Sequence, residues 1–183
     1  MDVLELHQRA LAEARRVIDG VTLDDFPTPT PCADWDVRAL LNHIVSGNWL
    51  FAAIATGKEP PDASGDYIGN DPVGAFARSA SVVHGAFTAP PFAAATFPPP
   101  AGESPAPALV HTAELATHAW DLVRATGQPV TLDEELCDAA LEIVRRGMEG
   151  RTREAGGPFE PEQPVAGDAP AGDRLAAFLG RTI

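Results

Sequence analysis

At 183 residues, the chain suits one domain, or one domain with a small appendage, and is long enough to bury a core. Its formal charge of −13 argues against a nucleic-acid partner, which needs clustered Lys and Arg, and against docking on an anionic membrane. The sequence starts without a signal peptide, and no stretch reaches the roughly 18–20 apolar residues of a membrane span, so we expect a cytoplasmic protein.

The first half of the chain predicts two helices joined by a loop. Apolar residues at three- and four-residue steps indicate an amphipathic helix over about residues 2–19, with Gly20 as its stop. Three prolines among threonines and aspartates make 21–35 an extended loop. Asp36 is a good N-cap and opens a second helix that runs to about Thr56.

The second half continues this alternation of helices and Pro-rich loops. Asp71-Pro72 starts a third helix that ends near Phe87, and the seven prolines of residues 89–107 exclude a continuous helix there. Further helices are predicted at about 108–126, from Thr131 or Asp133 to about Gly147, and over 174–179 after a loop at 150–170.

These patterns predict an all-α protein. No run alternates as a strand should, and the first four helices, at about 16–21 residues each, have the length scale of a four-helix bundle. We therefore expect a single domain over residues 1–183, with the bundle core in about 2–147 and a C-terminal tail, 150–183, that adds a helical segment.

The fourth predicted helix carries metal-competent side chains on one face. Glu114 and His118 are four residues apart, so their side chains project together, with roughly 5–6 Å between Cβ atoms. His111 and Asp121 fall on the same face, and four polar groups there would be costly to bury unpaired. His43 lies at the edge of the apolar stripe of the second helix, so it is turned inward. A carboxylate and an imidazole, with a third donor from a facing helix, can build a metal site inside a bundle.

Each of these residues also has a plainer interpretation. The Glu114–His118 spacing is common and fits a surface pair, and His43 alone fits a hydrogen-bonded core histidine. His111 stands in the first turn of its helix, where exposure is the rule, and it is not expected to bind the metal.

The remaining donors are interpreted as lying outside the ligand set. His7 and His84 flank apolar residues and are expected to be non-ligands. Asp121 either orients a ligand imidazole or is a surface residue. Cys32 could supply a thiolate, but a free buried cysteine is the simpler interpretation, and with Cys137 as the second cysteine no disulfide framework is predicted.

Two segments in combination resemble a known family. PCADWDVRALLNHIV, followed some 70 residues later by ELATHAWDLVRATGQP, is similar to the metal-binding domain of mycothiol-dependent maleylpyruvate isomerase, within the DinB-like superfamily. The ending Asp173–Arg181 also looks like that of a small actinobacterial group within it, and the similarity covers roughly residues 5–181. The resemblance implies a four-helix bundle whose metal ligands are His43, Glu114 and His118. It also implies a divalent ion, typically zinc, and a thiol such as mycothiol as cosubstrate.

The leading hypothesis is a divalent-metal-binding, thiol-dependent transferase or isomerase-like enzyme whose thiol is activated at the metal. Its partners would be a small-molecule thiol and an unknown electrophile. Maleylpyruvate isomerisation itself is not expected, because the isomerase has a separate C-terminal domain for which this chain leaves no room. The alternatives are a metal-dependent hydrolase, an Fe(II) oxygenase with two histidines and one carboxylate, or a non-catalytic metal-binding protein. A homodimer is left open.

The cleft beside the metal would need walls and a group to hold a polar cosubstrate. The Pro-rich segments 21–35 and 89–107 are predicted as walls. Arg38 and Arg124, one turn or so from the ligands, are the sequence candidates for an anionic substrate group, with simple solvation of both as the alternative.

Overall fold

The computed structural model describes residues 2–32, 35–62, 64–90, 106–154 and 160–183. Within these ranges the regular elements are all helices, as predicted, and Pro29 and Asp36 form an isolated bridge. The elements are α1 (Val3–Ile18), a short 3₁₀ turn (Leu23–Asp25), α2 (Val37–Thr56), α3 (Pro72–Phe87), α4 (Pro107–Thr126), α5 (Glu134–Gly147) and α6 (Ala171–Phe178). The prediction for 89–107 falls mostly on residues 91–105, which lie outside the described ranges.

Local capping chemistry explains where the helices begin and end. Aspartates cap four helices, because a side-chain oxygen accepts a free backbone N–H of the first turn: Asp2 for α1, Asp36 for α2, Asp71 for α3 and Asp133 for α5. Gly57 and Gly127 end α2 and α4 at a φ of 65°, a left-handed conformation that favours glycine.

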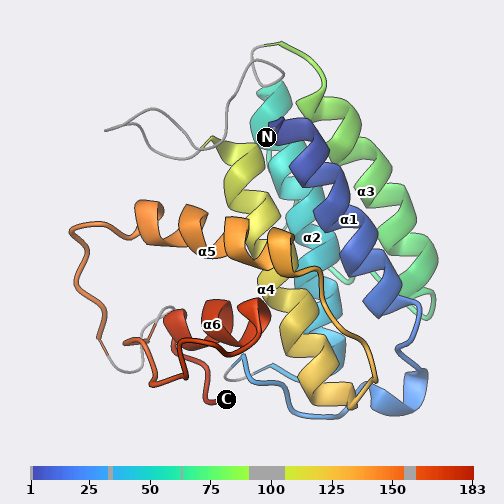
Figure 1. Ribbon diagram of the computed structural model, residues 1–183. Coiled ribbons are helices and arrows are strands. Elements are labelled where there is room, and N and C mark those ends of the chain that lie inside the picture. The colour runs from blue at the N-terminus through green and yellow to red at the C-terminus, as the bar shows by residue number, and fades with distance from the viewer. Residues whose placement is uncertain (1, 33–34, 63, 91–105, 155–159) are drawn as a thin grey trace.

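The first four helices pack side by side as a bundle (Figure 1). α1 packs against α3 and α4, and α2 packs against the same two helices from the other side. Their inward stripes of Leu, Ile, Val, Ala and Phe form one buried cluster. The four-helix bundle expected from the sequence is therefore confirmed.

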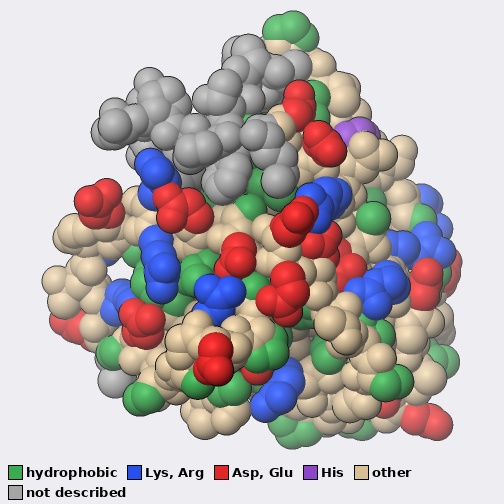
Figure 2. All heavy atoms as spheres, in the orientation of Figure 1, with side chains coloured by type: hydrophobic (Ala, Val, Ile, Leu, Met, Phe, Trp, Pro, Cys, Tyr) green, Lys and Arg blue, Asp and Glu red, His purple; other side chains and the backbone are tan. Residues whose placement is uncertain are grey.

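The last two helices lie across the bundle rather than along it (Figure 1). α5 crosses α4, and α6 packs against both α5 and α4. These two helices form a C-terminal layer that ion pairs hold in place. Arg9 of α1 pairs with Asp133 at 2.6 Å, and Arg174 of α6 pairs with Asp138 of α5 at 2.7 Å. On the face shown in Figure 2, acidic and basic side chains are interspersed over these helices rather than separated.

α2 is, among the described helices, the one long and apolar enough by length and composition to cross a membrane. This is weak support for a span, because a core helix of a soluble protein passes the same test and α2 packs against α3 and α4.

Candidate metal centre

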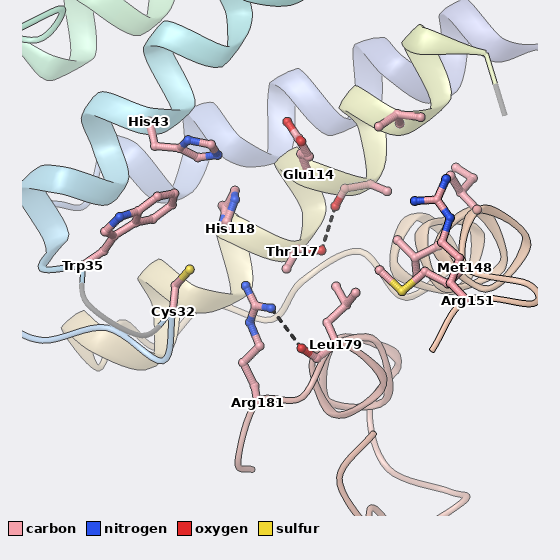
Figure 3. A pocket seen from close by; sticks show the side chains of 15 residues that line it. Cys32, Trp35, His43, Glu114, Thr117, His118, Met148, Arg151, Leu179 and Arg181 are labelled. Atoms are coloured by element: carbon pink, nitrogen blue, oxygen red, sulfur yellow. Dashed lines mark hydrogen bonds between the residues drawn. The ribbon is translucent and has the colours of Figure 1, made fainter. Parts of the chain in front are cut away.

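A cavity of about 480 Å³ opens between α2, α4, α5 and the C-terminal segment. One side of it holds the predicted ligands His43, Glu114 and His118 (Figure 3). The opposite side is largely apolar, with side chains such as Ile143 and Met148 from α5 and its end. A pocket of this size, apolar with a few converging polar groups, is typical of a small-molecule site.

The three predicted ligands meet at one end of this cavity. The His43 and His118 rings stand edge to face, with centroids 4.9 Å apart, so the facing helices bring them together as expected. Trp35 packs against His43, with ring centroids 4.4 Å apart. Gly47, one turn after His43, has no atom within 4 Å of where a Cβ would lie, and this leaves room beside the imidazole.

A second, much smaller cavity of about 10 Å³ lies between these ligands. His43, Glu114 and His118 line it, together with His111, Gly47 and the apolar side chains of Ile44 and Leu115. A polar space of roughly 10–15 Å³ is large enough for a single water or ion.

Burial sets the charge of the predicted ligands. Burial, and then the neighbouring His118, lowers the pKa of His43 to about 4, so its ring is neutral at pH 7 and keeps a lone pair for a metal. Burial raises the pKa of Glu114, and within the described chain its carboxylate accepts no hydrogen bond. The imidazoles of His43 and His118 and the carboxylate of Glu114, which accepts no hydrogen bond from the described chain, are the donor types that zinc binds. The residues therefore fit a divalent ion, and coordination by this trio stays a prediction.

His118 is oriented by a carboxylate. Its Nδ1 lies 3.0 Å from Oδ2 of Asp121, which is fully buried, so Nε2 is the nitrogen left for the cavity. A carboxylate on the far nitrogen of a ligand histidine fixes its tautomer and raises its basicity. The interpretation of Asp121 as the residue that orients His118 therefore agrees with the geometry.

Arg181 completes this arrangement from the C-terminal segment. Its guanidinium donates to both oxygens of Asp121, at 3.2 and 3.0 Å. Burial alone would raise the pKa of Asp121, but the hydrogen bond with His118 and the Arg181 charge outweigh burial and lower it. Asp121 is thus held ionised beneath His118.

A second donor set shares His118 with the predicted trio. Cys32, His118 and Asp121 are the one described group whose three donor atoms all lie within 4.8 Å of one another. The predicted trio is set more widely, so an ion bound there would draw its ligands inward. The Cys32 set is nevertheless a poor cation site, because the Arg181 guanidinium already neutralises Asp121 and burial raises the pKa of the Cys32 thiol.

Several other expectations need correction or refinement. His111 is 1% exposed rather than at the surface, because α1 packs over the start of α4 and His7 bonds to it. Arg38 and Arg124 do not line the cavity: Arg38 pairs with Asp66 at 2.9 Å, and Arg124 lies over the Trp120 ring.

The cationic groups at the cavity are instead Arg151 and Arg181, which the sequence analysis missed. Arg181 closes the ending Asp173–Arg181 that carried part of the resemblance, and this was the available signal. Of the predicted walls, the loop 21–35 contributes Cys32 and Trp35, while 91–105 lies outside the described ranges.

Comparison with known proteins bears on this geometry. The family described as Mycothiol maleylpyruvate isomerase N-terminal domain matches residues 7–123. The chain belongs to this family. The match contains all three predicted ligands of this DinB-like family member, whereas α5, α6 and Arg181 lie beyond it.

Full-length relatives of this family member also exist. Two uncharacterized proteins of Mycobacterium tuberculosis, MT0763 of strain CDC 1551 / Oshkosh and Rv0738 of strain ATCC 25618 / H37Rv, are each 38% identical over 185 residues. Each alignment covers 100% of this chain and 100% of the relative, so the C-terminal layer is included. No solved structure matches the chain.

Proposed function

We propose that this protein is a divalent-metal-dependent enzyme that transfers or rearranges a group with the help of a small thiol, of the mycothiol type, activated at the metal. The single observation that carries the proposal is the convergence of His43, Glu114 and His118 on one ion-sized cavity. Membership in a mycothiol-related family supports the choice of thiol.

The chain's own residues would hold the ion and prepare the cavity. His43 offers a neutral nitrogen, Glu114 offers a carboxylate, and the Asp121–Arg181 pair orients His118 so that Nε2 faces the cavity. Zinc is the divalent ion best suited to these donors, and when bound it lowers the pKa of a thiol so that a thiolate nucleophile forms at pH 7.

The larger cavity would receive the thiol and its electrophile. Trp35, Ile143 and Met148 supply apolar walls that exclude water from the reacting sulfur, and Arg151 stands at the cavity as a cation. The partners of this chain are on this view a thiol and an electrophile rather than a nucleic acid or a membrane, and the cytoplasm, where such thiols are kept reduced, is the proposed compartment.

Titration of the cobalt-loaded protein with mycothiol, or with a cysteinyl analogue, tests the thiol step. We expect a sulfur-to-metal charge-transfer band to grow together with release of a proton, because a cation close to sulfur favours the thiolate. The S-methylated analogue is the matched control and should produce no band. A metal spectrum that no thiol changes, in a protein that hydrolyses esters or amides, would replace the proposal by the hydrolase.

A further inference from the structure

His7 and His111 form a buried imidazole pair directly behind the candidate metal cavity. His7 Nε2 lies 3.0 Å from His111 Nδ1, and the two side chains are 0% and 1% exposed. Burial, and then the charge of neighbouring histidines, lowers both pKa values, that of His7 to about 3, so both rings are neutral. Packing alone does not account for the pair, because His7 Nδ1 is buried without a hydrogen-bond partner in the described chain.

His111 reaches the cavity from the same helix face as the predicted ligands. It precedes Glu114 by three residues and His118 by seven, a spacing that places all three on one face of α4. All three, with His43 of α2, line the cavity of about 10 Å³. Four metal-competent side chains therefore line one ion-sized space. No three of their donor atoms lie within 4.8 Å of one another, so a bound ion would draw them inward.

The orientation of His111 repeats that of His118. In each ring Nδ1 is taken by a buried partner, Asp121 for His118 and His7 for His111, so Nε2 is the nitrogen without a protein partner in the described chain. Phe51 fixes the plane of the His111 ring by stacking, with centroids 4.6 Å apart. A histidine whose far nitrogen is bonded and whose plane is fixed is arranged as metal-ligating histidines are.

We propose that His111 is a fourth protein donor to the divalent ion, and that His7 is the residue that positions it. The His111 Nδ1–H donates to His7 Nε2, which leaves the Nε2 lone pair of His111 for the ion. His7 then carries its own hydrogen on the unpartnered Nδ1. The proposal rests on the metal part of the proposed function and not on its thiol step.

A fourth donor changes how the site would work. Four protein ligands fill a tetrahedral zinc site and leave no position for water. A thiol then has to displace one donor or enter as a fifth, and His111, which comes from outside the predicted trio, is the donor to be displaced. The resting protein would thus be closed to water and open to a ligand as strong as a thiolate.

Competition of the metal-free protein with a chromophoric chelator for cobalt tests the assignment. We expect His111→Gln and His7→Gln each to weaken cobalt binding by about 10- to 100-fold and to change the visible cobalt spectrum. His84→Gln is the matched control, because the His84 ring stacks on His7 at 6.0 Å but does not line the cavity, and it should stay within twofold of wild type. Thermal unfolding of the metal-free variants separates a folding defect from a binding defect.

A second measurement needs no substitution. In the proton spectrum of the cobalt-loaded wild type, three histidine ring N–H signals should be shifted by the paramagnetic ion, where the trio alone predicts two. Two shifted signals, or wild-type affinity and spectrum in His111→Gln, overturn the proposal. A cobalt spectrum that responds to His111→Gln but not to thiols would refute the thiol step and leave the fourth donor standing, whereas a wild type that binds no divalent ion overturns both.

Discussion

Glu114 destabilises the metal-free protein. Its pKa is raised by burial, which means that the ionised carboxylate is less stable there than in water, and no hydrogen bond in the described chain compensates it. A residue that weakens the fold but faces an ion-sized cavity is explained by the ion it would hold.

Glu114→Gln should therefore have opposite effects in the two states. We expect it to raise the free energy of unfolding of the metal-free protein by about 1 kcal/mol at pH 7, because a buried charge is removed. It should also abolish the rise in Tm that zinc produces in the wild type, because the ligand is lost. Urea and thermal unfolding with and without zinc measure both effects, and a variant that keeps the zinc-dependent rise removes Glu114 from the ligand set.

Metal binding also tests the two histidines of the trio. His43→Ala and His118→Ala should lose at least about 100-fold in zinc affinity, since a missing ligand costs more than a missing partner of a ligand. Metal per chain, measured by emission spectrometry after gel filtration, gives the result. Unchanged metal content in His43→Ala would refute its assignment, and His84→Ala serves as the reference.

Arg181 acts on the site through Asp121. Arg181→Leu leaves a fully buried carboxylate without its cation, which should cost about 3 kcal/mol of stability, and should weaken zinc binding about 10-fold by loosening His118. Arg174→Leu, which removes the more exposed pair with Asp138, should cost about 0.5 kcal/mol and leave zinc binding unchanged. Equal effects of the two substitutions in urea unfolding and zinc titration would contradict this role.

At the scale of the elements, the sequence predicted the helices well because their causes are local. The 3.6-residue periodicity and the aspartate caps at Asp36 and Asp71 act within one or two turns, so they are readable without the fold. α6 begins at Ala171 rather than at 174, because its first turn is anchored from outside: the Ala171 N–H donates to Glu134 at 2.8 Å.

The candidate site was only half predictable, because part of it depends on contacts between residues far apart in the sequence. Glu114 and His118 share a helix face, which spacing reveals, whereas Arg181 reaches Asp121 only because Gly180 turns the chain at a φ of 92° after α6. The burial of His111 depends on how α1 lies over α4, a long-range contact that no local pattern encodes.

α6 is seated closely enough for a single side chain to displace it. A Cβ on Gly172 would lie 3.1 Å from Trp120 Cδ1, closer than ordinary packing, and would also contact Leu132 Cδ1 at 3.4 Å. Gly172→Leu should therefore destabilise the protein by about 1–3 kcal/mol in urea unfolding. Because α6 leads to Arg181, the same variant should weaken zinc binding.

Gly85→Ala is the matched control for this substitution. Nothing lies within 4 Å of its Cβ position on α3, so we expect a gain of about 0.5–1 kcal/mol from the better helix former, with zinc affinity unchanged. A Gly172→Leu variant as stable as wild type would show that α6 can shift to accommodate the larger side chain.

For the molecule as a whole, buried neutral histidines predict sensitivity to acid. The pKa of His7 is lowered to about 3 and that of His43 to about 4, from an ordinary 6.5. Between pH 6.5 and 4 the unfolded chain therefore binds protons that the folded chain does not, and the free energy of unfolding falls as the pH falls. Glu114 acts in the opposite direction, because its raised pKa lets the folded state bind a proton more tightly.

The pKa of His111 is also lowered by burial, and these three histidines should dominate, so the metal-free protein should lose on the order of a few kcal/mol of stability between pH 7 and pH 4. Urea unfolding at several pH values measures this loss. His7→Gln should flatten the curve by removing one of the titrating groups, and an identical pH dependence in the variant would show that His7 is not responsible.

The burial of Cys137 against α6 makes its alkylation rate a measure of how often the C-terminal helices open. Its side chain is 1% exposed, burial raises its pKa to about 12, and a Cβ on Gly172 would lie 3.7 Å from its sulfur. Cys32, by contrast, is partly exposed at the cavity. An alkylating reagent should thus modify Cys32 at a rate that a bound ligand slows, and Cys137 only when the C-terminal layer lifts away. Because the two cysteines differ in exposure, one mass spectrum reports both quantities: modification of Cys32 follows the occupancy of the cavity, and modification of Cys137 follows the detachment of α6.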